Sequence, residues 1–362
     1  MKILLVRLRQ IGDVVFTTPA IRAVRQQYPD AHLTYLVEPA AEPVVRYNPH
    51  LSHVLVAPRV RGVAGIRADL TLGARLRREA YDIAVDFHGG PRASLLTWMS
   101  RAPVRIGYAV RGRSWMYTRR VGRPRELRAR HSVENQWDLL EALGVGPPSA
   151  ERFPVEMQHD SATATALAAR LAAAGIHTED RLIVMHVSAG NPFRRWPIAS
   201  FGEVAAALAT SIPGVRVVVT SGPSEADAAS RVIADARGRL DPSEWSRVLA
   251  CGEFSLLELR ALMDRAVLYV GGDSGPMHIA ATSRVPVVAL YGPTLPARSA
   301  PWRSARWPSV AVEVLGLECR PCDQRVCAPG DFRCLAGIQP RQAVAAAERL
   351  VKSETAWPPK QP

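Results

Sequence analysis

The chain has 362 residues, enough for two domains of ordinary size, and its 48% apolar and 22% charged residues are typical of a globular protein. No apolar run approaches the roughly 20 residues of a membrane-spanning helix, and the start lacks a signal-peptide cleavage site, so we expect a cytoplasmic protein. Residues 1–150 carry 23 basic and 12 acidic side chains, and this net charge of +11 indicates a polyanionic partner such as nucleic acid, anionic lipid or phosphorylated glycan.

The first half alternates short apolar runs with amphipathic stretches, which predicts strands and helices in turn. It opens with a strand at 3–8, a turn up to Asp13, a helix at 14–28 and a second strand at 33–37. A strand–helix–strand unit this short implies a parallel sheet with a right-handed crossover. Further elements of the first half are predicted at 54–57, 69–80, 82–87 and 135–143.

Asp13 follows the first strand and comes immediately before the predicted helix. A carboxylate at such a position most often caps the helix. It could instead face a cleft and act as a general base. The sequence periodicity leaves both roles open.

Residues 144–155 are rich in glycine and proline and are typical of a linker. The second half then repeats the alternation, with helices at 161–174, 198–211, 225–237, 255–265 and 276–283 and strands at 182–187, 215–220, 248–250, 267–270 and 286–290. We therefore predict two doubly wound α/β domains, residues 1–150 and 156–350, and the C-terminal segment could pack back on the first. Ligands of such sheets bind at the carboxyl ends of the strands, which predicts an active site in the cleft between the domains.

The stretch 271–278, Gly-Gly-Asp-Ser-Gly-Pro-Met-His, follows a predicted strand and opens a helix. Its small residues leave backbone N–H groups, including that of Gly275, uncovered at the positive end of a helix, which suits a phosphate. Asp273, Ser274 and His278 add side chains at the rim. The alternative interpretation of this segment is a glycine-rich turn with a capping residue. No Gly-x-Gly-x-x-Gly occurs and no lysine follows a glycine, which excludes the nicotinamide fingerprint and the P-loop.

Two adjacent arginines, Arg194 and Arg195, follow the first strand of the second half and the small residue Ser188. Together they could clamp a diphosphate, or form a solvated pair beside a packing tryptophan. Glu225 follows the next strand and could accept hydrogen bonds from ribose hydroxyls, or only stabilise the following helix N-terminus.

Four cysteines, Cys319, Cys322, Cys327 and Cys334, lie within one short segment. Four thiolates in a loop-rich part of a cytosolic protein could hold a structural zinc ion in tetrahedral geometry. Free thiols and disulfides remain alternatives.

Taken together, these stretches resemble glycosyltransferase family 9, the family of the ADP-heptose–lipopolysaccharide heptosyltransferases, from Lys2 to about Val351. The segments that carry the resemblance are 5–20, 131–140, Arg194-Arg195-Trp196-Pro197, 272–278 and Tyr291-Gly292-Pro293-Thr294. Arg194 stands where the family has a phosphate-binding lysine, and Ser274 stands where threonine is common.

The resemblance implies a GT-B fold of two Rossmann-like domains, with the acceptor on the first and the nucleotide sugar on the second. It implies an inverting transfer of heptose from ADP-heptose to the lipopolysaccharide inner core, with Asp13 as base and no cofactor required for catalysis. The enzyme would work at the inner face of the inner membrane, in peripheral contact with anionic lipid. The alternatives are another nucleotide sugar, a protein acceptor or, from charge alone, a nucleic-acid-binding protein, which the absence of any recognised binding motif disfavours.

Overall fold

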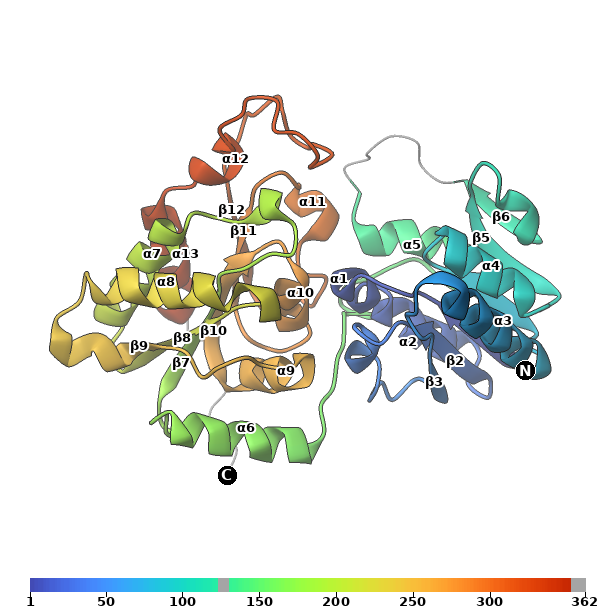
Figure 1. The fold of residues 1–362 in the computed structure, drawn as a ribbon, viewed down its shortest axis with the longest axis horizontal. Helices are drawn as coiled ribbons and strands as arrows, with labels where there is room; N and C mark the ends of the chain where they lie inside the picture. The colour runs from blue at the N-terminus through green and yellow to red at the C-terminus, as the bar shows by residue number, and fades with distance from the viewer. Residues whose placement is uncertain (123–129, 353–362) are drawn as a thin grey trace. The chain divides into compact units, whose positions relative to one another are not determined.

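The computed structural model describes residues 1–122 and 130–352 and divides into two compact units, Met1–Gln158 and a second that begins at His159. Each unit contains one six-stranded sheet with helices on both faces (Figure 1). None of the helices in the described ranges has the length and apolarity of a membrane span.

The sheet of the first unit has the order β3-β2-β1-β4-β5-β6, and all its strands are parallel. Its strands are β1 (Lys2–Val6), β2 (His32–Val37), β3 (His53–Val56), β4 (Ile83–Asp86), β5 (Val104–Ala109) and β6 (Arg119–Gly122). The helices that pack on it are α1 (Ile11–Val15), α2 (Thr18–Gln27), α3 (Gly62–Arg78), α4 (Pro91–Met99) and α5 (Ser132–Glu141). Helix α3 packs beside α4, and α2 packs beside α5.

The sheet of the second unit has the order β12-β11-β10-β7-β8-β9 and is also parallel throughout. Its strands are β7 (Arg181–His186), β8 (Val215–Thr220), β9 (Val248–Leu249), β10 (Ala266–Gly272), β11 (Val287–Tyr291) and β12 (Ser309–Glu313). Its helices are α6 (Ser161–Ala173), α7 (Ile198–Ser211), α8 (Ala226–Arg237), α9 (Leu256–Arg265), α10 (Gly275–Ala281), α11 (Pro296–Ser299), α12 (Arg333–Ala336) and α13 (Pro340–Lys352). Helices α8 and α13 both pack against α7, while α6 and α10 pack against α9.

The two sheets share one topology, in which the chain starts in the middle, runs to one edge and then returns to build the other half. The reversal falls between β1 and β4 in the first unit and between β7 and β10 in the second. The crossover helices leave these two neighbouring strands in opposite directions, so the carboxyl ends of the strands stay uncovered there. The predicted doubly wound architecture is confirmed, and each sheet has a switch point that can hold a ligand.

The predicted single helix at 14–28 is wrong, because the chain forms α1 and α2 with a break at Phe16 and Thr17. Pro19 lies in the first turn of α2, where it has no N–H to donate to the preceding turn. The Thr18 hydroxyl instead donates to the Val15 carbonyl at 2.8 Å, which satisfies an acceptor that the break exposes.

Helix α3 begins at Gly62, seven residues before its predicted start at 69. The missed turns carry Val63 and Ile66, which are both exposed. Their spacing therefore does not follow the buried face of the helix, and the pattern that normally reveals a helix was absent there.

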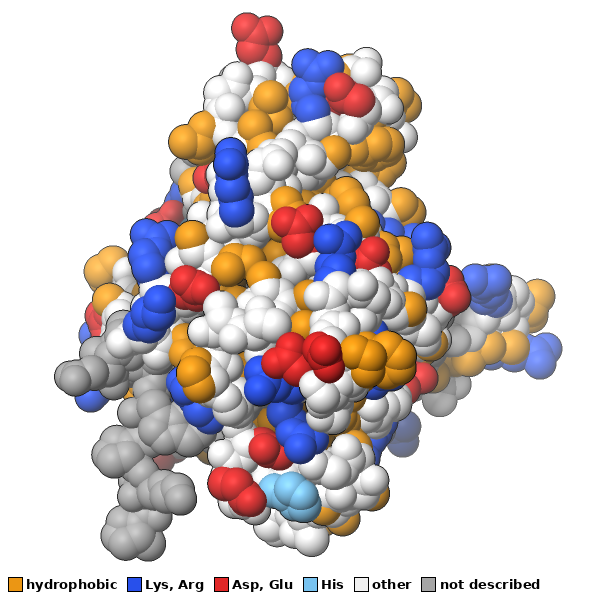
Figure 2. All heavy atoms as spheres, turned by 90° about the vertical axis from the view of Figure 1, so that its left-hand side faces the viewer, with side chains coloured by type: hydrophobic (Ala, Val, Ile, Leu, Met, Phe, Trp, Pro, Cys, Tyr) orange, Lys and Arg blue, Asp and Glu red, His pale blue; other side chains and the backbone are white. Residues whose placement is uncertain are grey.

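Strand β12 and helix α13 were not predicted, although both complete the second unit. Up to Lys352 the C-terminal segment packs within this unit, where Ala343, Ala346, Ala347 and Leu350 of α13 join the core with strands β10 to β12. Figure 2 shows acidic and basic side chains interspersed over one face of the second unit, as expected from its near balance of charge.

Candidate functional site

Asp273 is the centre of a hydrogen-bonded cluster at the carboxyl end of β10. Its Oδ2 accepts from the Thr294 hydroxyl at 2.5 Å, and its Oδ1 lies 3.4 Å from Nε2 of His278. Nη1 of Arg194 lies 3.5 Å from Oδ2 and donates to the Asp273 carbonyl at 3.1 Å. The structure thus brings together three of the residues selected from the sequence, Asp273, His278 and Arg194.

The Asp273 carboxylate is buried, and burial alone would raise its pKa. The hydrogen bond and charge of His278, with the positive charge of Arg194 and the hydroxyl of Thr294, outweigh that effect and hold the pKa below its ordinary value. The carboxylate is therefore ionised at neutral pH. The Arg194 guanidinium that helps to compensate it is partly exposed, so one edge of this cationic group can meet a ligand.

Arg194 is held on its other side by the segment that contains the cysteines. Its Nε donates to Oε1 of Gln324 at 2.7 Å, and the Asn191 amide donates to the same oxygen at 2.9 Å. The Gln324 side chain and the Asp273 carbonyl, from distant parts of the chain, therefore hold the Arg194 guanidinium in place.

Arg195 has different partners from Arg194. Nη2 of Arg195 pairs with Oε1 of Glu225 at 2.6 Å, and its Nε donates to the Ala189 carbonyl at 2.9 Å. From the sequence we predicted separate roles for the two residues, phosphate binding by Arg195 and ribose binding by Glu225. In the structure they form one ion pair. The pair links the loop after β7 to the loop after β8.

Ser188, His186 and Thr220 form a second polar cluster where β7 and β8 end. The Ser188 hydroxyl accepts from the Gly222 N–H at 2.7 Å and lies 3.1 Å from Nε2 of His186, whose Nδ1 is 3.0 Å from the Thr220 hydroxyl. Burial lowers the pKa of His186 to about 4, so the ring is neutral at physiological pH. His186 and Thr220 escaped the sequence analysis because each is the last residue of a largely apolar strand.

Ser274 and Gly275 begin α10 immediately after this edge of the sheet. Ser274 occupies the N-cap position without a capping hydrogen bond, and its hydroxyl is buried with no partner among the described residues. Space is also tight at the end of β10, since a Cβ on Gly272 would lie 3.3 Å from the Arg194 carbonyl. The Ser274 hydroxyl is thus a buried polar group that a ligand could satisfy.

Asp13 lies in the first turn of α1 in the other unit, and the helix-cap interpretation is wrong. The N-cap residue is Gln10, and no side chain makes a capping hydrogen bond there. Asp13 instead pairs closely with Arg7, whose Nη1 donates to the Phe87 carbonyl at 2.6 Å. Because Arg7 is anchored on the backbone, it holds the partly exposed carboxylate of Asp13 in a defined position.

Asp86, at the end of β4, is a buried carboxylate that the sequence analysis missed. It accepts from the Tyr117 hydroxyl at 2.6 Å and from the backbone N–H groups of His88 and Gly89 at 2.8 and 2.9 Å. Burial raises its pKa, although these hydrogen bonds oppose the shift. Asp86 therefore fixes the loop after β4, next to the carbonyl that anchors Arg7.

The four cysteines of the predicted zinc site are all free thiols, and Cys334 is the most buried of them. Burial raises the pKa of Cys334, and the three other thiols act in the same direction. Across the described ranges, however, no three His, Cys, Asp or Glu side chains are grouped so that they could hold a metal ion. The thiols are thus not grouped as metal ligands in this structure, and the zinc site stays a prediction.

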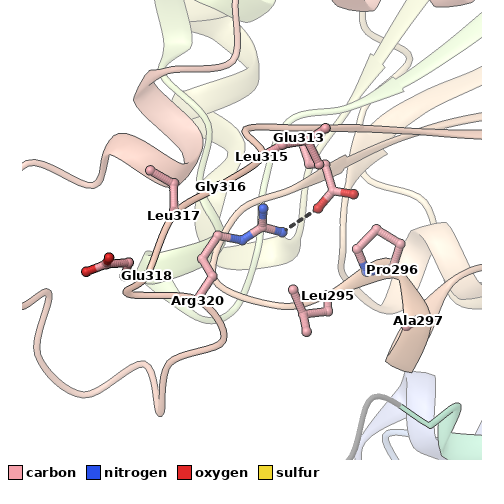
Figure 3. A pocket seen from close by; sticks show the side chains of 9 residues that line it. All are labelled: Leu295, Pro296, Ala297, Glu313, Leu315, Gly316, Leu317, Glu318 and Arg320. Carbon is pink, nitrogen blue, oxygen red and sulfur yellow. Dashed lines mark hydrogen bonds and ion pairs between the residues drawn. The ribbon is translucent and has the colours of Figure 1, made fainter.

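A pocket of about 530 Å³ lies at the ends of β11 and β12, one strand beyond Asp273 (Figure 3). Leu295, Pro296 and Leu317 line it, with an ion pair of 2.8 Å between Arg320 and Glu313. None of the residues selected from the sequence lines this pocket. Arg320 also donates to the Thr294 carbonyl at 2.7 Å, so the pocket wall and the Asp273 cluster share one loop.

Comparison with known proteins gives a consistent result over most of the chain. The model of "Glycosyltransferase family 9 (heptosyltransferase)" matches residues 70–331. Lipopolysaccharide heptosyltransferase 3 of Escherichia coli strain K12 is 29% identical over 299 residues, which cover 82% of this chain and 83% of that protein.

Two solved structures share the fold of both units. The glycosyl transferase family 9 protein of Veillonella parvula has a TM-score of 0.80 and 25% identity, covering 97% of each chain. The ADP-heptose LPS heptosyltransferase II of E. coli has a TM-score of 0.78 and 21% identity, covering 98% of this chain and 99% of that one.

The buried neutral state of His186 predicts a pH-dependent stability. An unfolded histidine has a pKa near 6.5, whereas folded His186 has a pKa of about 4, so the unfolded state binds more protons between these values. Stability is therefore lost as the pH falls from 6.5 towards 4, by about 2 kcal/mol at pH 5. The free energy of unfolding in urea should be measured at pH 7.5 and at pH 5. His186→Gln should reduce the difference in unfolding free energy between these two conditions by this amount. The exposed His177 provides the control, since His177→Gln should leave the difference unchanged. Equal pH dependence in wild type and His186→Gln would contradict the assignment.

Proposed function

Because the chain belongs to glycosyltransferase family 9, we propose that it transfers heptose from ADP-heptose to the lipopolysaccharide inner core by an inverting reaction that needs no metal. That it is a glycosyltransferase follows from the family match over residues 70–331 and the similar heptosyltransferases. The donor, the acceptor and the residue roles are the proposed part. The observation that carries the proposal is the position of Arg194 and Asp273 at the switch point of the second sheet.

The donor would bind to the second unit through its diphosphate. Arg194 is partly exposed, and the buried Ser274 hydroxyl has no partner among the described residues. A diphosphate brings acceptor oxygens that could satisfy both groups, together with the backbone N–H of Gly275. The fold neighbour named an ADP-heptose heptosyltransferase supports adenosine diphosphate as the nucleotide.

The ribose would bind near the ends of β7 and β8. Ser188 and the Arg195–Glu225 pair lie on these two loops, and Glu225 has a second oxygen with which to accept from a ribose hydroxyl. Arg195 would then orient Glu225 rather than bind phosphate itself. His278 would act through Asp273, whose Oδ1 lies 3.4 Å from Nε2 of His278.

The reaction exchanges one carbon–oxygen bond for another. An acceptor hydroxyl oxygen attacks the anomeric carbon of heptose, the bond from that carbon to the β-phosphate oxygen breaks, and ADP leaves from the opposite face. The hydroxyl proton passes to the Asp13 carboxylate. Arg7 acts as a positioning residue, because its anchored guanidinium holds Asp13 while the exposed part of the carboxylate accepts the proton.

Negative charge develops on the leaving diphosphate, and the site must stabilise it. Arg194 and the amides at the start of α10 would do so as preorganised donors, which is the role that a divalent cation has in many other transferases. We therefore propose catalysis without a bound cofactor. A structural zinc ion at the four cysteines would be a separate matter, with no part in the chemical step.

The acceptor would bind to the first unit, where the excess of basic residues lies. A lipopolysaccharide inner core carries carboxylates and phosphates, so its charge is opposite to the net +11 of residues 1–150. Since this acceptor is anchored by lipid, the enzyme would work in peripheral contact with the anionic face of a membrane.

The direct test is incubation of the purified protein with ADP-heptose and a panel of truncated core glycolipids, with ADP release and product mass as readouts. We expect a mass gain of one heptose on one acceptor, at an initial rate unchanged by EDTA because protein cations stabilise the leaving group. Transfer only from another nucleotide sugar, or only to protein, would overturn the proposed substrates. A rate abolished by EDTA and restored by Mg²⁺ or Mn²⁺ would overturn the metal-independent mechanism.

Arg194→Ala should weaken ADP binding by about 1–3 kcal/mol, the scale of a hydrogen bond to a charged group, which is roughly 5- to 150-fold in Kd. Isothermal titration calorimetry with ADP alone measures this without the acceptor. Arg239→Ala is the matched control, because Arg239 lies in the same unit and pairs with Asp235 on the surface. An unchanged Kd in Arg194→Ala would remove this residue from the donor site.

Asp13→Asn should lower kcat by about 10²–10⁴, since an amide cannot accept the proton that general-base catalysis requires. The Asn oxygen can still accept from Arg7, and the pair is partly exposed, so stability should fall by no more than about 1 kcal/mol. ADP affinity should not change, because the nucleotide would bind to the other unit. Asp30→Asn, at an exposed position of the same unit, is the control. A variant that keeps more than about a tenth of wild-type kcat would show that Asp13 is not the base.

A further inference from the structure

Helix α3 has an exposed apolar stripe that the fold does not use. Val63, Ile66 and Leu70 are 68%, 63% and 57% exposed. At about 100° per residue, the three side chains fall within an arc of about 60° on one side of the helix. Single exposed apolar residues are common, but three in register on one helix form a continuous surface.

The helix is held in place by a different face. Leu72, Gly73 and Leu76 are buried, and a Cβ on Gly73 would lie within 3 Å of the Met99 side chain of α4, so the two helices are in close contact there. Asp69 also points inward, where it pairs with Arg92 at 2.7 Å. Packing on the sheet is therefore complete without the stripe.

The side chains around the stripe are arginines. Arg77 falls in the same arc, and Arg67 and Arg78 lie along one flank at the same 100° spacing. All three are exposed, and within the described residues none of them has a carboxylate partner. From Arg59 to Arg78 the chain has six arginines and one acidic residue, Asp69, which Arg92 already neutralises.

A tryptophan lies on the neighbouring element. Trp115 in the short helix η2 (Ser114–Met116) is exposed and packs edge-on against Trp98 of α4, at 5.6 Å between ring centroids. The Arg101 guanidinium lies over the Trp98 ring at 4.4 Å. Helices α3 and α4 lie side by side in Figure 1, and η2 packs on α4. Tryptophan and arginine together are typical of surfaces that meet the head groups of a bilayer.

We infer that the outer face of α3 binds an anionic lipid bilayer, with Val63, Ile66 and Leu70 entering the interface and Arg67, Arg77 and Arg78 contacting lipid phosphates. The combination of an apolar stripe, flanking arginines and no free carboxylate matches an interfacial helix, and the net charge of this half has the sign that anionic lipid attracts. This inference rests on the proposed function in one respect, because a lipid-anchored acceptor is what would bring the enzyme to a bilayer.

The test is flotation with vesicles that contain neither donor nor acceptor. Wild type should bind vesicles of phosphatidylglycerol and phosphatidylethanolamine, and bind phosphatidylcholine vesicles weakly. Val63→Ser/Ile66→Ser should weaken binding to the anionic vesicles by at least about tenfold, because two apolar side chains no longer enter the interface. Arg67→Gln/Arg77→Gln/Arg78→Gln should also weaken it and reduce its dependence on salt.

The matched control is Leu315→Ser/Val326→Ser, which removes the same number of exposed carbons from the second unit, at side chains 78% and 75% exposed. It should leave vesicle binding unchanged. Circular dichroism and ADP affinity, a property proposed for the second unit, check that each variant is folded. Equal vesicle binding by wild type and Val63→Ser/Ile66→Ser would overturn the inference, as would no binding of wild type to anionic vesicles. If the substitutions only convert a dimer into a monomer, the stripe is a contact between two copies and the inference is wrong.

Transfer assays separate this inference from the proposed function. With a deacylated, soluble core oligosaccharide, Val63→Ser/Ile66→Ser should match wild type in kcat and KM. With the same core anchored in anionic vesicles, the apparent KM of this variant for the core should be severalfold higher than that of wild type. If wild type transfers heptose to neither acceptor, the proposed substrates are wrong, while the vesicle-binding result is unaffected.

Discussion

The reversal of strand order in each parallel sheet is the constraint on which the candidate site depends. Where β7 and β10 lie side by side, their crossover helices depart in opposite directions, and no helix covers the strand ends. Ser188 and Asp273 follow these two strands, so residues 85 positions apart reach one edge without a long loop. The same reversal between β1 and β4 brings Arg7 next to the Phe87 carbonyl and so fixes Asp13. Because the strand order leaves this edge of the sheet uncovered, the side chains there can take part in chemistry without disturbing the hydrophobic core.

A buried charge at such an edge must be compensated, and Asp273 illustrates how. Isolated, its carboxylate would favour the protonated form, yet His278, Thr294 and Arg194 together keep it ionised. These three partners come from α10, from the loop after β11 and from the loop after β7. One desolvated carboxylate therefore ties one helix and two loops to a single geometry, and all three partners offset the cost of its burial. The Arg195–Glu225 pair ties the next loop in the same way.

Hydrophobic periodicity and turn residues in the sequence were sufficient for the architecture, because the central strands of a parallel sheet covered on both faces are apolar runs and most crossover helices bury one face. The sequence predictions failed where the hydrophobic pattern does not match the buried positions. The early turns of α3 carry their apolar residues on the solvent side, and β12 has exposed residues at its edge of the sheet. Strand-end positions such as Ser188, Asp273 and Arg194 were recognisable from local chemistry. Their partners were not, since the bonds of Arg195 with Glu225 and of Arg194 with Gln324 join residues 30 and 130 positions apart, and no local rule pairs them.

Gln324 connects a loop outside both sheets to the candidate site. This residue, in the left-handed region at a φ of 58°, accepts from both Asn191 and Arg194 through one amide oxygen, yet it belongs to a loop with no part in either sheet. The loop is also joined to the end of β12, where Arg320 pairs with Glu313 at 2.8 Å. Gln324 reaches the guanidinium of Arg194 directly, through a single contact. A substitution at Gln324 can therefore change how the Arg194 guanidinium is held without replacing any residue of the sheet that carries it.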